Sequence, residues 1–201
     1  MEESGLKDVY ARVYEAARPE LFFKAAGWRV VGPGGDVAIR PDSSWDVPEP
    51  ELAVLGNSRG EVVAFSCGND MSSRSIEGEN PLYLPQAKVY DGSCSLGPGA
   101  VPAWEVDLRG EAVRLEIERA GARVFSGEVS LEQMVGKPAE LLRSLLRFYA
   151  CPAGVWLLTG TGIVPDPPYS AEEGDVVRVA IEGLGTLVNR VTKLPDPSPV
   201  G

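Results

Sequence analysis

The sequence contains no histidine, and this absence excludes several classes of catalytic and metal site. Without imidazole there is no Ser-His or Cys-His nucleophile system, no His-ligated zinc and no histidine general base. Any acid–base chemistry must therefore come from carboxylates, lysines, tyrosines or metal-bound water.

Cysteine is scarce, and long apolar runs and basic clusters are lacking. The three cysteines Cys67, Cys94 and Cys151 are an odd number without metal-ligand spacing, so we expect buried, reduced thiols. No run approaches the roughly 20 apolar residues of a membrane span, and the N-terminus lacks the pattern of a signal peptide. We therefore expect a cytoplasmic protein with no membrane partner.

The chain is acidic, with a formal net charge of −10 and a pI near 4.6. An acidic surface repels phosphate backbones, and no Lys/Arg cluster forms a basic face, so we expect no nucleic-acid partner. Clustered carboxylates would instead suit a hard cation.

The hydrophobic pattern predicts a β-rich α+β domain with a few peripheral helices. Residues 111–118 alternate between apolar and polar side chains, and Gly121 turns this strand toward a partner at 122–125. Further strands are expected at 154–158 and 175–181. With 201 residues, 23 glycines and 17 prolines, the chain suits one domain of short strands and tight turns.

Helices are expected outside this strand-rich part. An i, i+3, i+4, i+7 apolar stripe predicts an amphipathic helix over residues 6–17. Ser130 with Gln133 fits a capping box, and Pro138 fits the first turn of a helix ending near Tyr149. Residues 195–201 are expected to form a flexible tail.

Two carboxylates flank a proline in Glu49-Pro50-Glu51, at the start of an apolar run. Residues two apart in an extended chain point to the same face, so both carboxylates aim at one place. Their repulsion would be reversed by a cation. Taken alone, however, Glu-x-Glu is more often a solvated strand face.

A third carboxylate, Asp70, follows the apolar strand that begins near Glu61. The common interpretation of Asn69-Asp70 before Ser is a turn or helix cap. An antiparallel return of this strand would instead bring Asp70 beside the glutamate pair. Three carboxylates without His or Cys indicate Mg²⁺, Mn²⁺ or Ca²⁺ rather than zinc.

Several motifs, in this order along the chain, resemble the fumarylacetoacetate hydrolase family. They are Pro48-Glu-Pro-Glu-Leu-Ala-Val, Gly68-Asn-Asp-Met-Ser-Ser-Arg, Lys88 followed by Ser95-Leu-Gly-Pro, Leu157-Leu-Thr-Gly-Thr-Gly and Ile181-Glu-Gly-Leu-Gly-Thr-Leu-Val-Asn. Residues 19–24 and 76–94 most resemble the 2-keto-3-deoxy-pentonate dehydratases, which act on arabinonate or xylonate derivatives.

The resemblance implies a mixed β-sandwich roll with peripheral helices. It implies that residues 1–201 form a single C-terminal catalytic domain, with the family's N-terminal domain largely absent, and that the protein forms a homodimer or higher homo-oligomer. It also implies Mg²⁺ held by Glu49, Glu51 and Asp70.

Further site residues follow from the resemblance alone. Lys88 and Glu20 would be catalytic, and the substrate-binding residues would be Ser72, Arg74, Glu77, Gly160 and Thr161. Without the resemblance, Lys88 is a solvated charge, Glu20 an ordinary helix-boundary residue and residues 159–162 a turn. Ser75 departs from the family, which usually has Asp there, and this change is expected to weaken an ion pair supporting Asp70 or Arg74.

Three functions are compatible with these residues. The first is dehydration of a 2-keto-3-deoxy sugar acid to an oxo-acid semialdehyde, with Lys88 as candidate base and Glu20 as candidate acid, their roles being open. The second is hydrolysis of a C–C bond or decarboxylation of an acylpyruvate-like diketo acid, which the lack of histidine makes harder. The third is a shortened family member that binds ligand without catalysis.

Overall fold

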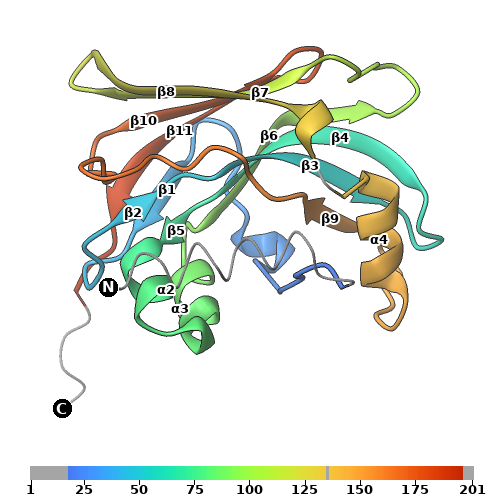
Figure 1. Ribbon diagram of the computed structural model, residues 1–201, viewed down its shortest axis with the longest axis horizontal. Helices are drawn as coiled ribbons and strands as arrows, with labels where there is room; N and C mark the ends of the chain where they lie inside the picture. The colour runs from blue at the N-terminus through green and yellow to red at the C-terminus, as the bar shows by residue number, and fades with distance from the viewer. Residues whose placement is uncertain (1–17, 135, 197–201) are drawn as a thin grey trace.

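A computed structural model describes residues 18–134 and 136–196 of the chain (Figure 1). The helix expected over residues 6–17 and most of the expected tail, residues 197–201, lie outside the described residues. Across the described part, no helix is long and apolar enough to cross a membrane.

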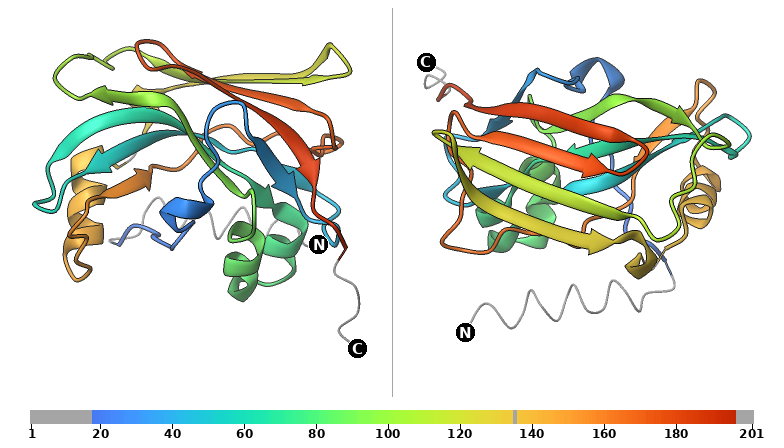
Figure 2. Two further views of the ribbon diagram at one scale, coloured as in Figure 1. Left: turned by 180° about the vertical axis from the view of Figure 1, so that it is seen from behind. Right: turned by 90° about the horizontal axis from the view of Figure 1, so that it is seen from above.

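Two facing β-sheets form the body of the molecule, and short helices lie at its edges (Figures 1 and 2). The strands are β1 (Asp36–Ile39), β2 (Asp46–Val47), β3 (Pro50–Gly56), β4 (Val62–Asp70), β5 (Ser72–Ser73), β6 (Cys94–Pro102), β7 (Ala112–Arg119), β8 (Ala122–Ser130), β9 (Val155–Leu158), β10 (Val176–Ile181) and β11 (Gly185–Lys193). The helices are η1 (Gly27–Arg29), α2 (Arg74–Glu79), η2 (Pro81–Tyr83), α3 (Leu84–Lys88), η3 (Leu131–Gln133) and α4 (Pro138–Leu146).

The sheets differ in strand order and direction. The five-stranded sheet has the order β1-β11-β10-β7-β8, and its edge strand β1 runs parallel to β11 while the other pairs are antiparallel. The four-stranded sheet, β6-β4-β3-β9, is antiparallel throughout, and β2 pairs with β5 in a separate two-stranded ladder. The predicted β-rich, mixed β-sandwich roll with peripheral helices is therefore confirmed.

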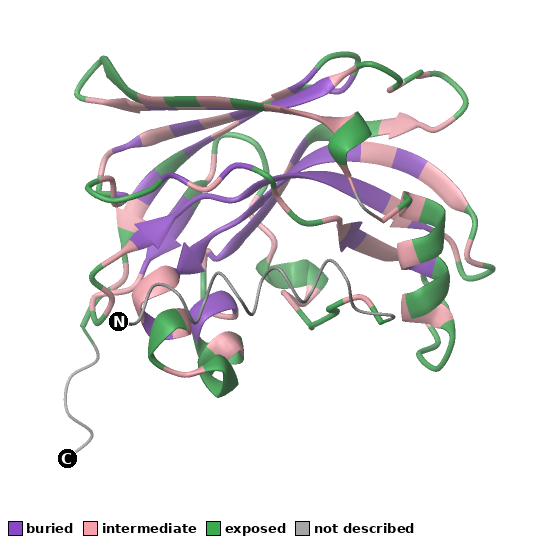
Figure 3. Ribbon diagram, in the orientation of Figure 1, coloured by how far each residue is buried: buried purple, intermediate pink, exposed green. Residues whose placement is uncertain are grey.

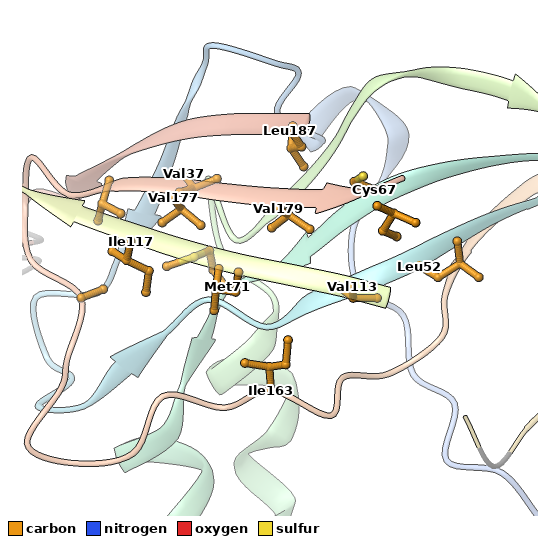
Figure 4. Close-up of a cluster of buried hydrophobic side chains, with 14 of the residues drawn as sticks. Val37, Leu52, Cys67, Met71, Val113, Ile117, Ile163, Val177, Val179 and Leu187 are labelled. Atoms are coloured by element: carbon orange, nitrogen blue, oxygen red, sulfur yellow. The ribbon is translucent and has the colours of Figure 1, made fainter. Parts of the chain in front are cut away.

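The core lies between the two sheets, where the alternating strands place their apolar faces (Figures 3 and 4). Leu115 and Ile117 of β7 are fully buried, and Val177 and Val179 of β10 are each 1% exposed. Burying one such side chain contributes about 1.5–3 kcal/mol, so this interface dominates the stability of the fold. The alternation expected for 111–118 and 175–181 is confirmed.

The two helical elements after β8, η3 and α4, begin where the sequence pattern predicts. Ser130 caps η3 by accepting a hydrogen bond from the backbone N–H of Glu132, although this segment is a 3-10 turn rather than an α-helix. α4 begins at Pro138 and ends at Leu146, short of the expected end near Tyr149.

The cysteines are free among the described residues, as expected. Cys67 and Cys94 are buried, but Cys151 is only half-buried, so the expected burial is wrong for that thiol. Burial raises the pKa of the Cys67 thiol to about 11, which keeps it protonated at neutral pH.

Candidate active site and metal centre

The pairing of β3 with β4 brings the three carboxylates together. The strands are antiparallel, with Glu51 opposite Gly68, and Glu49 exchanges backbone hydrogen bonds of 3.2 and 2.9 Å with Asp70. Glu49 and Glu51 share one face because they are two residues apart. One ligand oxygen from each of the three residues lies within 4.8 Å of the others. The predicted antiparallel return is confirmed.

All three carboxylates are buried, and their ionisation differs. Burial and repulsion by Asp70 and Glu49 raise the pKa of Glu51 to about 8. Burial raises the pKa of Asp70 despite nearby ammonium groups. For Glu49, burial is outweighed by the charges of Lys88 and Arg74, so its pKa is lowered. The cluster thus holds more negative charge than its surroundings readily support.

Each carboxylate has one oxygen within 2.8 Å of a donor group of the protein. The backbone N–H of Gly160 donates to Glu51 Oε2 at 2.5 Å, and Lys88 Nζ donates to Glu49 Oε2 at 2.8 Å. Lys24 Nζ lies 2.5 Å from Asp70 Oδ1. Such outer contacts orient metal ligands. The second oxygens of Glu49 and Asp70 lie 3.4 Å from Arg74 NH1 and Lys88 Nζ, respectively. A buried, all-oxygen donor set with excess negative charge fits Mg²⁺ or Mn²⁺.

Lys88, predicted as a catalytic residue, is the last residue of α3 and is 4% exposed. Besides Glu49, its Nζ contacts Ser72 Oγ at 2.5 Å and Asp70 Oδ2 at 3.4 Å. Although burial opposes its charge, the three carboxylates Glu49, Asp70 and Glu77 raise the pKa of Lys88. A cation bound by the trio would lower this pKa, because a nearby like charge disfavours the charged ammonium.

Ser72 is fully buried beside Lys88. Its hydroxyl donates to Asp70 O at 3.1 Å and accepts the hydrogen bond from Lys88. The structure therefore places Ser72 as a support for Lys88, and its predicted contact with substrate remains a prediction.

Arg74 and Glu77 begin α2 and lie at the edge of the trio. Arg74 NH1 is 3.4 Å from Glu49 Oε1 and 3.3 Å from Glu77 Oε2, and its guanidinium lies 5.6 Å from the ring of Trp45. The fold thus brings both residues to the site.

Glu20 reaches the same site from a segment far away in sequence. Partial burial, then repulsion by Glu77 and Glu49, raises the pKa of Glu20, while Lys88 opposes the rise. Residue Glu20 is exposed, and the charges that act on its pKa belong to the cluster. A raised pKa suits a residue that donates a proton.

Gly160 and Thr161 follow β9 in a loop. Gly160 has a φ of 88°, a backbone conformation that glycine adopts readily, and this conformation directs its N–H to Glu51. The Thr161 hydroxyl instead donates to Ile163 O and accepts from Ile163 N, both at 3.1 Å. The structure therefore places the Gly160 N–H against the Glu51 carboxylate and Thr161 in the turn that follows. The predicted contacts of both residues with substrate remain predictions.

Two local findings were not anticipated from the sequence. Lys24 was not singled out, although a lysine directly after two phenylalanines in Phe22-Phe23-Lys24 is a usable signal for a charge held at a buried site. Ser75 Oγ lies 2.9 Å from Ser43 Oγ and accepts from Ser44 N at 3.0 Å. Ser75 therefore holds the loop before β2 through hydrogen bonds to Ser43 and Ser44. Arg74 pairs with Glu49 and Glu77 although Ser75 replaces the family's Asp.

A family model described as Fumarylacetoacetate (FAA) hydrolase C-terminal matches residues 3–192, which include every site residue described above. The chain belongs to the fumarylacetoacetate hydrolase family. The family membership inferred from the motifs is thereby confirmed.

Curated relatives are similar over nearly the whole chain. The probable 2-keto-3-deoxyxylonate dehydratase of Haloferax volcanii is 49% identical over 192 residues, which are 95% of this chain and 66% of the relative. The 2-dehydro-3-deoxy-D-arabinonate dehydratase of Saccharolobus solfataricus is 42% identical and covers 93% of this chain and 63% of its own length. The chain therefore spans just under two thirds of these relatives.

A solved structure shares the fold closely. The 2-keto-3-deoxy-D-arabinonate dehydratase complexed with magnesium and 2,5-dioxopentanoate superposes with a TM-score of 0.91 at 41% identity. The match covers 94% of this chain and 67% of that one.

Proposed function

We propose that this chain is the catalytic domain of an Mg²⁺-dependent hydro-lyase that dehydrates a 2-keto-3-deoxy-pentonate to 2,5-dioxopentanoate. The observation that carries the proposal is the buried trio Glu49, Glu51 and Asp70, flanked by Lys88 and approached by Glu20. The magnesium and 2,5-dioxopentanoate named for the solved relative supply the matching cofactor and product.

The trio would hold the cation through its oxygens, with Lys88, Lys24 and the Gly160 N–H fixing the ligands. A bound Mg²⁺ supplies Lewis-acid polarisation of the 2-oxo acid, worth several kcal/mol of charge stabilisation. Arg74 lies within 3.4 Å of the trio and is the side chain best placed to attract the anionic carboxylate of such a substrate.

Lys88 and Glu20 divide the proton transfers in this proposal. Lys88, once deprotonated, takes a proton from C3, and Glu20 gives a proton to the hydroxyl that leaves C4 as water. The unsaturated acid then loses a proton from C5 and gains one at C3, which leaves an enol at C4 and C5. The hydroxyl proton of this enol moves to C4 and gives the C5 aldehyde. The overall change is the loss of one water molecule, so no oxidant or reductant is required.

The test is turnover of purified protein on a panel of 2-oxo acids with Mg²⁺ and with EDTA. We expect 2-keto-3-deoxy-xylonate or -arabinonate to yield a semialdehyde only with Mg²⁺, and Glu49→Ala to abolish the reaction. Turnover of acylpyruvates or oxaloacetate without turnover of the deoxy sugar acids would instead support the hydrolase or decarboxylase alternative. Absence of both turnover and Mg²⁺ binding would support the ligand-binding alternative.

Deuterium exchange at C3 assigns the two proton-transfer roles. In D₂O, Glu20→Gln is expected to exchange the C3 protons of the substrate while losing on the order of 10²-fold or more in turnover. Lys88→Met is expected to lose both exchange and turnover. The reverse pattern would exchange the two roles and leave the reaction itself unchanged.

Self-association also belongs to the proposal. Large exposed apolar side chains, including Trp28 at 79%, Leu82 at 83% and Phe148 at 90%, are available for contacts between subunits. A homodimer or higher homo-oligomer in sedimentation equilibrium would agree with this proposal, and a monomer would contradict it. The cytoplasmic location predicted from the sequence stays a prediction.

A further inference from the structure

The segment that carries Glu20 is poorly attached to the rest of the fold. Residues 19–26 form neither helix nor strand, and Figures 1 and 2 show this part of the chain on the same side of the four-stranded sheet as α2 and α3. The side chains between Glu20 and Lys24 are exposed: Leu21 at 38%, Phe22 at 41% and Phe23 at 64%. Apolar packing therefore does little to fix the position of Glu20.

Lys24 is the exception in this segment. Its side chain is 10% exposed, and its Nζ contacts Asp70 Oδ1 at 2.5 Å, Met71 O at 3.0 Å and Lys88 O. An ammonium has three N–H donors, so each has a partner. Among the described residues, no other member of 19–26 makes a hydrogen bond to β4 or α3.

The three partners lie on the two elements that carry the site. Asp70 and Met71 are at the end of β4, and Lys88 is at the end of α3. Lys24 thus attaches the segment 19–26 to the end of β4, which carries Asp70, and to the end of α3, which carries Lys88. Glu20 precedes Lys24 by four residues, which limits its backbone to within roughly 14 Å of that anchor.

We propose that Lys24 is a positioning residue that anchors the segment 19–26 and so holds Glu20 over the carboxylate site. This inference rests on the proposed function for the role of Glu20, but the anchoring itself is independent of any reaction. Lys24 has all its donors occupied, so it acts through the placement of Glu20 and of its own segment rather than by moving a proton.

Limited proteolysis tests the anchoring without an activity assay. All variants are compared in saturating Mg²⁺, which supplies positive charge beside Asp70 when Lys24 is removed. We expect Lys24→Met to speed chymotryptic cleavage after residues 21–23 by about tenfold or more, because a released segment is cleaved from its open form. Cleavage near Phe148 and Tyr149, which are 90% and 62% exposed, is the internal standard and should not change.

Matched variants control for charge and folding. Lys193→Met removes an exposed lysine at the end of β11 and is expected to cleave like the wild type. Lys24→Gln keeps amide donors and is the milder second variant if Lys24→Met fails to fold. Unchanged cleavage after residues 21–23 in a folded Lys24 variant would overturn the proposal.

A double-mutant cycle tests the link to Glu20. At saturating Mg²⁺, we expect Lys24→Met to lower kcat on the order of 10²-fold, as Glu20→Gln does. Loss of the contact to Asp70 should also raise the Kd for Mg²⁺ by about tenfold or more, which saturation removes from the comparison. The double variant should be no slower than Glu20→Gln alone, because both changes remove the same contribution. Additive losses at saturating Mg²⁺ would show that Lys24 acts through Asp70 rather than through Glu20 and would overturn the proposal.

Failure of the proposed function has a different signature. If Glu20→Gln turns over at the wild-type rate, the acid role of Glu20 is wrong. The cleavage rates then still decide whether Lys24 anchors the segment.

Discussion

The chemistry of individual residues explains why three carboxylates can share one buried site. Each has one oxygen bound to a donor from a different part of the chain: the Gly160 N–H, Lys24 or Lys88. These contacts offset part of the cost of burying the charges, yet the pKa of Glu51 stays raised to about 8. Protonation of Glu51 should therefore compete with cation binding.

Mg²⁺ binding is expected to depend on pH through Glu51. Because the pKa of Glu51 is raised from 4.5 to about 8, cation-stripped protein holds a proton there at neutral pH, and Mg²⁺ must displace it. The affinity should fall by about tenfold for each pH unit below 8. Calorimetry in buffers of different ionisation enthalpy should detect about one proton released per Mg²⁺ at pH 6.5.

The same shift has a defined sign for stability. A group whose pKa is raised on folding contributes stability that is lost as pH rises from the unfolded to the folded pKa, here from 4.5 to about 8. In EDTA, the wild type should lose up to about 1.4 kcal/mol per pH unit relative to Glu51→Gln across this window. Parallel urea-unfolding free energies of the two proteins at pH 5.5, 6.5 and 7.5 would refute the assigned shift.

At the scale of elements, turns decide how closely strands and helices approach the site. The turn at Gly92 joins α3, which ends at Lys88, to β6, and it lies against β1. Gly92 has a φ of 74°, and a Cβ there would lie 2.9 Å from the backbone N of Ala38. Backbone cannot move aside as a flexible side chain can. Glycine is therefore required at this position both by the positive φ and by the lack of space for a Cβ.

Gly92→Ala and Gly110→Ala form a matched pair that separates these two requirements. Gly110 has a similar φ of 78°, but a Cβ there meets nothing within 4 Å. We expect Gly110→Ala to lower the free energy of unfolding by about 1 kcal/mol through strain alone. Gly92→Ala should cost about 3 kcal/mol, since the backbone clash adds to the strain. Equal losses in urea unfolding would contradict this account.

For the whole molecule, the two sheets have different tasks. The five-stranded sheet supplies much of the buried apolar surface through strands such as β7 and β10 (Figure 4). The four-stranded sheet presents the three carboxylates, which could hold a metal ion, where β3 begins and β4 ends. Stability and cation binding should therefore respond separately to substitutions in the two sheets.

Leu115→Ala tests this separation. Leu115 of β7 is fully buried, so its truncation should lower the free energy of unfolding by about 3 kcal/mol. Below the unfolding transition, the Kd for Mg²⁺ should stay unchanged. Mg²⁺ at 100 times its Kd should then stabilise wild type and variant alike by about 2.7 kcal/mol.

The adjacent residue provides the control for this experiment. Arg114 lies on the opposite face of β7 and pairs with Glu128 at the surface, so Arg114→Ala should change stability by less than about 1 kcal/mol. A large change in Mg²⁺ affinity in Leu115→Ala would show that the two sheets do not act separately.

The sequence by itself determined the features that depend on local periodicity and on side-chain chemistry. Alternation in residues 111–118 and 175–181 predicted β7 and β10, because strand side chains point to opposite faces in turn. The lack of histidine limited a metal site to other ligands, but the spacing of Glu49 and Glu51 alone favoured a solvated strand face, and the family motifs were needed to predict a site there. Family motifs then supplied the remaining candidates.

Only the tertiary structure decided which donor groups contact the three carboxylates. Lys24 and Asp70 are 46 positions apart and Glu51 and Gly160 are 109 apart, and no local pattern reports contacts across such separations. The pKa of Glu51 likewise depends on burial and on neighbours brought in by other strands. The carboxylates were thus readable from the chain, whereas their ionisation and their anchors arise from packing, because charges interact through space rather than along the sequence.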